Sequence, residues 1–480
     1  MMANVNKGIG DRGALRRYHE LTKHSPASVA SSGHRLDWSV KPMSFKVFRQ
    51  LAPIPPPADL GRLCRLANGV LRWRRYPTGE RYGFRAAACT GALYHIELYL
   101  ATAARDDLPA GLYHYGAHDH AFRRLRAGDV RGTLVAATGG SEAVASAPLV
   151  FVFTSTFWRN AWKYQARAYR HAFWDSGAIL ANLLALLAAD ATPASVLMGF
   201  VDDAVDRLLG VDGLREAAVA VVAVGDRAAP PPTPGPLGEL SLSTEPLSSR
   251  EVRYPEIEEA HAASALGSEQ VAAWRERAGP GSQVVPPRAA DAAIDEVIAR
   301  RRSTRRFSVR SIARSDLESV LAAATSPVPG DAFTPERVTP FLIVNGVDGL
   351  EPGAYRADLS PIRVGDFRRF SGALALGQEL GADAAVDLYF LADLDAILDR
   401  LGERGYRVAQ MAGGIAGGRV DLAATALGLG ATGLTFFDDE VTRFFGPAGQ
   451  GRQVMYLATI GHRAWPNPPP RRSWVLTKRL

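Results

Sequence analysis

The sequence predicts an α+β fold built twice within one chain, and the clearest observation behind this prediction is a repeated pattern. GFVDDAVDRLLG begins at Gly199 and TFFDDEVTRFFG begins at Thr435. In both copies a glycine follows 7 residues after the second aspartate, and another glycine follows 15 residues later. Helix-like and strand-like segments also mix in each half without regular strand–helix alternation, which favours α+β over a doubly wound sheet.

Two further pairs of matching segments extend the repeat towards the N-terminus of each half. RAYR at 167–170 is matched by RGYR at 404–407, and LYHY…LRAGDVR at 112–131 is matched by AYR…IRVGDFR at 354–368. Ordered matches of this kind across most of each half indicate a fused tandem duplication. We therefore expect two similar domains in one chain.

The composition of the chain suggests where the domains begin and end. We expect an N-terminal arm over 1–40, a first half over 41–225, a Pro-rich linker with a short helix over 226–288, and a second half over 289–480. PPPTPGP at the start of this linker removes backbone donors and forbids helix, which marks an exit from the fold.

Each half gives the same order of elements. An amphipathic helix comes first, followed by a strand, a hairpin, a second strand, a long apolar helix after the RxYR motif, and a closing helix and β run. In the first half these are expected near 60–70, 92–104, 111–127, 147–155, 168–189 and 200–225; in the second half they are expected near 317–325, 339–347, 353–364, 385–393, 404–426 and 436–461.

Bulk properties exclude several classes of function. The chain is 47% hydrophobic with a net charge of +7, but its arginines are scattered and lack interleaved aromatics, so we expect no nucleic-acid partner. The apolar run 178–189 is too short to span a bilayer, so we expect a buried helix and no membrane. With two cysteines and no signal-peptide pattern, a cytoplasmic protein is expected.

Motif searches exclude other cofactors. No GxGxxG follows a strand, and no GxxxxGK[ST], HExxH or CxxC occurs, so dinucleotide, nucleotide-phosphate and metal sites are not expected. The segment RRSTRRF, from Arg301 to Phe307, instead places four guanidinium groups and a hydroxyl within six residues. Such planar forks suit a phosphate and a carbonyl-rich ring, although a solvated basic helix end is the alternative interpretation.

Four segments together resemble the FMN-dependent nitroreductase superfamily, and within it the SagB-type or ThcOx-like azoline dehydrogenases. They are RRSTRRF, ACTGALYH at 88–95, WKYQARAYRH at 162–171 and the arm segment YHELTKHSPASV at 18–29. The resemblance covers nearly the whole chain. It implies a nitroreductase fold, in which the enzyme is typically a dimer with each FMN at the interface: one subunit gives the arginine motif and the other gives the GALY-type loop.

The two copies have lost complementary parts of this site. Aligning Phe48 with Phe307 places Lys46 opposite Arg305, but Pro42 and Met43 opposite Arg301 and Arg302. The second copy has SPVPGDAFTPERV where the GALY loop should stand, and no Lys-Tyr pair precedes RGYR. We therefore expect an intramolecular pseudodimer with one FMN site, gripped by the second half and closed by the first.

The resemblance also assigns roles to single residues. The cofactor-binding candidates are Arg301, Arg302, Ser303, Arg305, Cys89, Thr90, Gly91, Thr435, Phe436, Arg471 and Arg472. Cys89 stands where the family has serine, so Thr90 is a substitute for its hydrogen bond. Arg471 and Arg472 are equally consistent with a solvated basic tail.

Lys163 and Tyr164 are the catalytic candidates. Dehydrogenation of a ring CH–NH pair requires removal of a proton, and a lysine or tyrosine with a shifted pKa can accept it. The alternative is a surface lysine beside a packed aromatic. His19, His24, His95 and His171 are lesser candidates, since a histidine with structural hydrogen bonds is the more common case.

Three functions follow from this site. The first is FMN-dependent oxidation of a thiazoline, an oxazoline or a related C–N bond in a natural product or modified peptide. The second is NAD(P)H-dependent reduction of a nitro, quinone or enone group, which needs no positioned base. The third is a non-catalytic peptide-binding role. Expected partners are a small-molecule or peptide substrate and biosynthetic partner enzymes.

Overall fold

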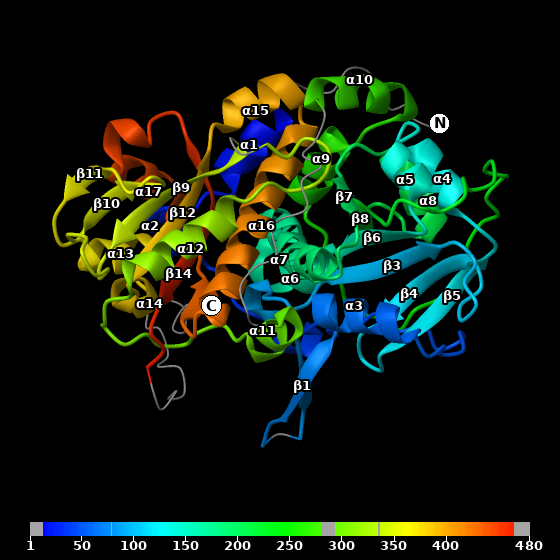
Figure 1. Ribbon diagram of the computed structural model, residues 1–480, viewed down its shortest axis with the longest axis horizontal. Coiled ribbons are helices and arrows are strands. Elements are labelled where there is room, and N and C mark those ends of the chain that lie inside the picture. Colours follow the sequence, from blue (N-terminus) through cyan, green and yellow to red (C-terminus); the bar gives the residue numbers. More distant parts are fainter. Residues whose placement is uncertain (1–12, 78, 280–292, 335–336, 465–480) are drawn as a thin grey trace.

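Two six-stranded sheets lie on either side of a central pair of long helices (Figure 1). The structure is a computed structural model that describes residues 13–77, 79–279, 293–334 and 337–464. The sheets have equivalent strand orders, β5-β4-β3-β6-β8-β7 and β11-β10-β9-β12-β14-β13, and all neighbouring strands are antiparallel. The predicted α+β fold and its tandem duplication are confirmed.

The first half contains the expected elements in the expected order, together with further short helices and strands. Its elements are α3 (Ala58–Asn68), β1 (Val70–Arg75), β2 (Arg81–Arg85), β3 (Ile96–Thr102), β4 (Gly111–Gly116), β5 (Ala121–Ala127), α4 (Arg131–Ala137), α5 (Glu142–Ser146), β6 (Leu149–Thr156), α6 (Phe157–Tyr164), α7 (Ala168–Ala189), β7 (Ala194–Leu197), α8 (Asp202–Leu209) and β8 (Glu216–Val224). The unpredicted elements are α4, α5, α6, β7 and the hairpin β1-β2, which is a separate two-stranded sheet.

The second half repeats this plan without the hairpin in its described part. Its elements are α11 (Ile294–Arg300), α12 (Arg314–Thr325), β9 (Thr339–Val344), β10 (Gly353–Arg356), β11 (Pro361–Val364), α13 (Arg368–Leu374), α14 (Glu379–Asp383), β12 (Val386–Ala392), α15 (Leu394–Leu401), α16 (Arg404–Ala426), β13 (Gly430–Gly433), α17 (Asp438–Phe444) and β14 (Gln453–Gly461). Before the halves come α1 (Ala14–Leu21) and α2 (Pro26–Ser31), and between them come α9 (Pro255–Ser264) and α10 (Ser268–Ala278).

The long helices α7 and α16 meet at equivalent glycines. A Cβ added to Gly177 would lie 2.5 Å from the carbonyl carbon of Gly414, and one added to Gly414 would lie 2.6 Å from the carbonyl oxygen of Trp174. Each glycine lies 10 residues after the first arginine of its RxYR motif. The close approach therefore lies on the pseudo-two-fold axis, and a side chain at either position would push the halves apart.

Buried ion pairs join the halves reciprocally. In the first motif, Arg167 and Arg170 bind the carboxylate of Asp438, which begins α17 of the second half, at 3.0 and 2.7 Å. In the second motif, Arg404 and Arg407 bind Asp202, which begins α8 of the first half, at 2.8 and 2.6 Å. The repeated RxYR and DD motifs are thus halves of one interface.

The segment that ends α9 repeats the contacts of the N-terminal arm. Thr22 Oγ1 accepts a hydrogen bond from Arg170, and His24 N–H donates to Asp438. At the other interface Ser264 Oγ accepts from Arg407, and Leu266 N–H donates to Asp202. Part of the expected linker is therefore a second arm that belongs to the second half.

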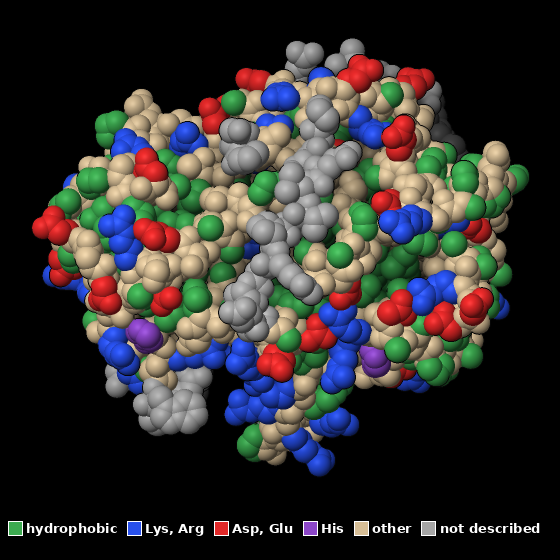
Figure 2. Space-filling model, viewed as in Figure 1, with side chains coloured by type: hydrophobic (Ala, Val, Ile, Leu, Met, Phe, Trp, Pro, Cys, Tyr) green, Lys and Arg blue, Asp and Glu red, His purple; other side chains and the backbone are tan. Residues whose placement is uncertain are grey.

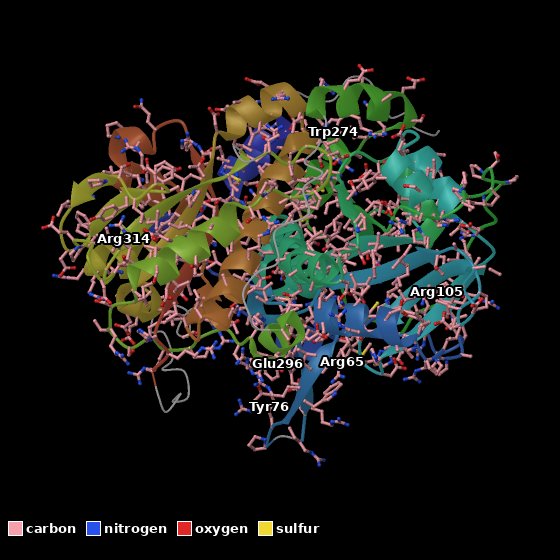
Figure 3. The ribbon with its side chains drawn as sticks, in the orientation of Figure 1. Arg65, Tyr76, Arg105, Trp274, Glu296 and Arg314 are labelled. Carbon is pink, nitrogen blue, oxygen red and sulfur yellow. The ribbon has the colours of Figure 1, made fainter. Side chains whose placement is uncertain are left out.

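Helix α10 completes the packing of this second arm against the second half. The indole Nε1–H of Trp274 donates to the carbonyl of Leu401 at 2.9 Å, where α15 ends (Figure 3). The chain between the halves is thus anchored on both of them.

The helical stretch Phe157–Ala189 is long and apolar enough to cross a membrane by length and composition alone. Of its most apolar window, 83% is buried inside the structure. Burial of this kind is typical of a core helix in a globular protein, so the prediction of a buried helix is confirmed.

We expect Asp202→Asn to destabilise the protein by about 3–5 kcal/mol, because it leaves Arg404 and Arg407 buried without a counter-charge. Urea unfolding measures this loss, and Asp203→Asn, an exposed neighbour on the same helix, is the matched control. Equal stability of the two variants would contradict the role of the interface.

The contribution of Asp202 to the stability of the protein depends on pH in a defined direction. Burial alone would raise the pKa of Asp202, but Arg404 and Arg407 lower it to about 2. The contribution of this group is therefore complete above the ordinary carboxyl pKa and is lost as the pH falls towards 2. In Asp202→Asn this part of the acid dependence should be absent.

Candidate functional site

The arginine motif of the second half contacts the GALY-loop region of the first half directly. Arg301 Nε–H donates to the carbonyl of Ala86 at 2.7 Å, and its Nη1 forms an ion pair with Asp421 of α16 at 2.9 Å. The two segments that the sequence predicts to share a site are therefore adjacent. Since Arg301 is buried with both partners, its main role is to join the halves at this point.

Several further guanidinium groups gather beside Arg301. The pKa of Arg302 is lowered by burial and by the positive charges of Arg72, Arg301 and Arg463. The described carboxylate that offsets them is Asp421, which pairs with Arg301. Arg302 itself donates to the carbonyls of Ala299 and Arg301. Mutually repelling cations of this kind are suited to bind a phosphate.

The loop that faces this cluster has a strained backbone. Gly91, Ala92 and Tyr94 have φ values of 61°, 55° and 53°, so three of four consecutive positions are left-handed. Each non-glycine residue in that region costs about 1–3 kcal/mol, which the surrounding structure must offset. Strain of this kind is concentrated at functional sites.

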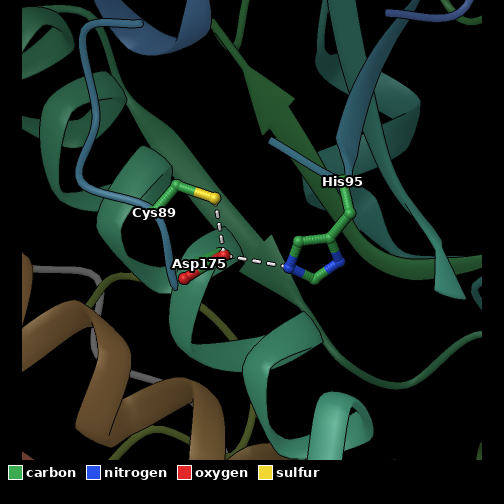
Figure 4. Close-up of side chains that lie close together, drawn as sticks. All are labelled: Cys89, His95 and Asp175. Atoms are coloured by element: carbon green, nitrogen blue, oxygen red, sulfur yellow. Dashed lines mark hydrogen bonds and ion pairs between the residues drawn. The ribbon is translucent and has the colours of Figure 1, made fainter. Parts of the chain in front are cut away.

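Asp175 of α7 holds the strained loop in place. Its carboxylate accepts hydrogen bonds from the Cys89 thiol at 2.9 Å, from Thr90 N–H at 3.0 Å and from the Thr90 hydroxyl at 2.8 Å. His95 Nε2 lies 2.9 Å from the same carboxylate (Figure 4). The side chains of Cys89 and Thr90 are therefore directed towards Asp175, and Gly91 forms the exposed tip of the loop.

Cys89, His95 and Asp175 also place three potential metal-ligand atoms within 4.8 Å of one another. Hydrogen bonds already connect these atoms, and Tyr94 N–H donates to the Cys89 sulfur at 3.0 Å. Burial and then Asp175 raise the pKa of the Cys89 thiol, which keeps it protonated as a donor. The arrangement is that of a hydrogen-bonded support for the loop.

The two catalytic candidates lie at the end of α6, opposite the arginine motif. The pKa of Lys163 is lowered by burial and by Arg305 of the second half, while burial, Asp175 and Cys89 raise the pKa of Tyr164. The Tyr164 hydroxyl lies against Gly91, because a Cβ added there would be 2.8 Å from it. Lys163, Tyr164, Gly91 and Arg305 therefore lie near one another at the seam, which is the boundary between the two halves.

Thr435 and Phe436 lie just before α17 and differ in orientation. Phe436 is fully buried with its ring 6.0 Å from that of Trp174, so its side chain belongs to the core. Thr435 is half-buried, and its N–H donates to no other described residue. The Thr435 backbone is thus the part of this pair that can contact a ligand.

The equivalent backbone groups in the first half are already occupied. Asp331, in the loop that replaces GALY in the second copy, accepts hydrogen bonds from Met198 N–H at 2.6 Å and Gly199 N–H at 2.9 Å. Gly199 corresponds to Thr435 in the repeated pattern. Gly330 of the same loop forms a parallel bridge with Val196 of β7.

The phosphate side of this twin site keeps cations that already have acidic partners: Arg227, the counterpart of Arg463 in the repeat, lies 3.8 Å from Asp226. Lys46, the counterpart of Arg305, forms an ion pair with Glu216 at 2.7 Å and is withdrawn from the seam. A cavity of about 290 Å³ beside β7 is lined by the carboxylates of Glu142 and Asp226 together with apolar residues and neutral serine and threonine side chains. Such a lining repels a phosphate.

The remaining sequence candidates lie elsewhere. Arg471 and Arg472 fall outside the described residues. Ser303 forms a parallel bridge with Ala431 of β13 through its backbone. His19 and His24 belong to the arm interface, where burial lowers the pKa of both. His171 donates to Asn160, which in turn donates to Thr90, so it supports the loop.

Sequence reasoning missed Asp175, Arg72 and Arg463. Arg463 follows the last β run directly in the sequence GHR, and that position could have drawn attention to it. Nothing in the pattern around Arg72 or Asp175 signals their place at the seam, because both are brought there by the packing of distant segments.

Known proteins match the chain over both halves. The profile of the nitroreductase family matches residues 50–226 and 298–462. A crystal structure of a candidate nitroreductase from Anabaena variabilis is 28% identical and superimposes with a TM-score of 0.79 over 94% of this chain and 99% of its own. A candidate nitroreductase of Methanocaldococcus jannaschii is 26% identical over 31% of this chain and 74% of its own length.

Both thiols should react slowly in the native protein. Burial raises the pKa of Cys64 and of Cys89, and Asp175 adds to the shift at Cys89. We expect modification by a chromogenic disulfide reagent at about pH 8 to be about tenfold or more slower than at the exposed control Ser319→Cys. Fast modification of Cys89 would show that its thiol is free of Asp175.

Proposed function

Because this chain belongs to the nitroreductase family, we propose that it is a flavin-dependent oxidoreductase that holds one FMN between its two halves. The observation that supports this proposal is the contact of Arg301 with Ala86, which brings the cationic cluster to the strained loop. The site is complete on one side of the pseudo-two-fold axis only, since Asp331 fills its twin.

The residues at the seam fit FMN by charge and by donor set. Arg302, Arg463 and Arg72 would hold the phosphate, because their charges gather without an equal number of carboxylates. Arg305 would lie near the pyrimidine edge, where reduction adds negative charge. Thr435 N–H and the backbone at Gly91 would contact the ring system. FMN, when bound, supplies an acceptor for hydride.

We propose that the substrate is a thiazoline, an oxazoline or a related ring with a C–N bond, carried by a natural product or modified peptide. Dehydrogenation of a thiazoline or oxazoline removes a proton and a hydride from its two adjacent saturated ring carbons, whereas a related ring with a CH–NH pair loses the hydride from carbon and the proton from nitrogen. Oxygen finally takes the electron pair together with two protons, which gives hydrogen peroxide. Lys163 accepts the proton. Its lowered pKa favours the neutral amine, which is the form that can act as a base.

Tyr164 has a different role in this proposal. Its raised pKa keeps the phenol protonated, so it donates a hydrogen bond and orients the substrate beside Gly91. Lys163 and Tyr164 thus divide the tasks of base and donor. A lysine in this position favours dehydrogenation over NAD(P)H-dependent reduction of a nitro, quinone or enone group, which requires no positioned base. It likewise favours catalysis over a non-catalytic peptide-binding role.

Flavin content tests the cofactor site. The native chain should bind one FMN, measured from the absorbance of released flavin per mole of protein. Arg302→Ala should weaken FMN binding by roughly tenfold to a hundredfold, because it removes a charge-assisted contact to phosphate. Arg300→Ala, exposed on the preceding turn, is the matched control. Two FMN per chain, or unchanged binding in Arg302→Ala, would refute this assignment.

Substitution of Lys163 tests the chemistry. We expect Lys163→Met to keep its FMN and to lose about 10²–10⁴-fold in turnover of an azoline substrate, because the base is gone. In the native enzyme, turnover should rise with pH through a pKa below that of an ordinary lysine. Gln165→Asn, exposed and two residues further on, is the control.

The same variant separates the alternatives. Unchanged azoline oxidation in Lys163→Met would remove Lys163 from the mechanism. Nitro or quinone reduction driven by NADPH, retained in this variant and without azoline oxidation in the native protein, would establish the reductase function instead. A chain that cannot be loaded with FMN would favour the non-catalytic role.

A further inference from the structure

The hairpin β1-β2 projects from the body of the molecule and carries a concentrated positive charge. Figure 2 shows Lys and Arg side chains gathered on this projection, and Figure 3 places Tyr76 near its end. We define the basic hairpin by its four exposed arginines and its exposed tryptophan, which are Arg72, Arg74, Arg75, Arg81 and Trp73.

None of the four arginines forms an ion pair with a described carboxylate. Glu80 at the end of the hairpin pairs with Lys41 instead, at 2.8 Å. Three of these guanidinium groups lie over aromatic rings: Arg72 is 4.8 Å from the ring of Phe84, Arg74 is 5.0 Å from that of Tyr76, and Arg81 is 4.8 Å from that of Trp73. Because Arg72 is assigned to the FMN phosphate, the hydrogen-bonding edges of Arg74, Arg75 and Arg81 are those that remain available to a second ligand.

The pairing of the strands is unfavourable for the free protein. Arg75 lies directly opposite Arg81 in the antiparallel register. Like charges at opposed positions destabilise a sheet, and a two-stranded hairpin is only marginally stable by itself. A negatively charged partner would remove this repulsion, so the charge pattern favours a bound state.

The geometry of the hairpin favours an extended peptide. Each strand pairs with the other only, so each has an outer edge without a strand partner. Such edges accept an added strand through backbone hydrogen bonds. The arginines discourage pairing with a second copy of this hairpin, because both would be positive, but they attract an acidic strand.

The hairpin is also connected to the flavin site. Arg72 lies close enough to Arg302 for its charge to lower the pKa of that residue. At the base of the hairpin, buried Arg85 lies 5.3 Å from the ring of Tyr94 in the strained loop. A segment bound along the hairpin would therefore lead towards Gly91 and Lys163.

We infer that the basic hairpin docks an acidic, extended segment of a peptide substrate and delivers its reacting ring to the seam. This inference rests on the proposed function, and it names the chemistry of the part of the substrate that lies outside the reacting ring.

Fluorescence anisotropy with a labelled peptide of alternating glutamate and threonine tests it. The triple variant Arg74→Gln, Arg75→Gln, Arg81→Gln should bind this peptide about tenfold or more weakly than the native protein. The matched control, Arg310→Gln, Arg356→Gln, Arg369→Gln, removes the same charge from exposed arginines elsewhere and should bind normally. Equal affinities of the two triple variants would overturn the inference.

Two further probes test the chemistry of the partner. A peptide with proline in place of threonine should bind more weakly, because proline cannot donate to an added strand. Equal binding of that peptide, or tighter binding of a single-stranded oligonucleotide of the same length through the same arginines, would overturn docking of an acidic strand.

Measurements of FMN content and azoline turnover distinguish a failure of peptide docking from a failure of the proposed function. Both triple variants should retain one FMN and turn over a short azoline substrate at the native rate. Loss of peptide binding with intact flavin supports docking, whereas intact peptide binding in a chain without azoline oxidation would refute the proposed reaction and the delivery of substrate together.

Discussion

The reciprocal binding of one aspartate by two arginines, buried at each end of the interface, is the constraint on which the rest of the structure depends. Asp438 lies with Arg167 and Arg170, and Asp202 lies with Arg404 and Arg407. Each arginine pair comes from the opposite half. A buried charge that loses its partner is far more costly than an exposed one, so each half requires the other to satisfy its own charges.

This constraint also fixes the seam on which both potential sites lie, and duplication then allowed the two to diverge. On one side, Arg301 reaches Ala86 and cations gather around Arg302. On the other, Asp331 occupies the backbone donors and Lys46 pairs with Glu216. Both sets of changes leave the arginine–aspartate interface intact. A symmetric interface can therefore accommodate one potential site with a backbone donor at Thr435 that binds no other described residue and a second in which the equivalent donors are occupied.

Much of this organisation can be predicted from the sequence, because duplication places each sequence motif in the chain twice. The RxYR and DD motifs stood out by their repetition, and so did the unequal arginine motif. The role of Asp175 was not predictable, since Cys89 and Asp175 are brought together only when the loop folds onto α7. The second arm was likewise not predictable. The carbonyls of His19 and His261 accept equivalent hydrogen bonds from Arg170 and Arg407, but the sequences around the two histidines share little similarity.

The position of the catalytic candidates at the boundary between the halves links assembly to chemistry. Lys163 belongs to the first half, but part of the shift in its pKa comes from Arg305 of the second. Burial at the seam supplies the larger part, and burial also requires both halves to be in place. Separation of the halves would return this lysine towards its ordinary, protonated state. The base that the proposed reaction needs is therefore a property of the docked pair and of neither half alone.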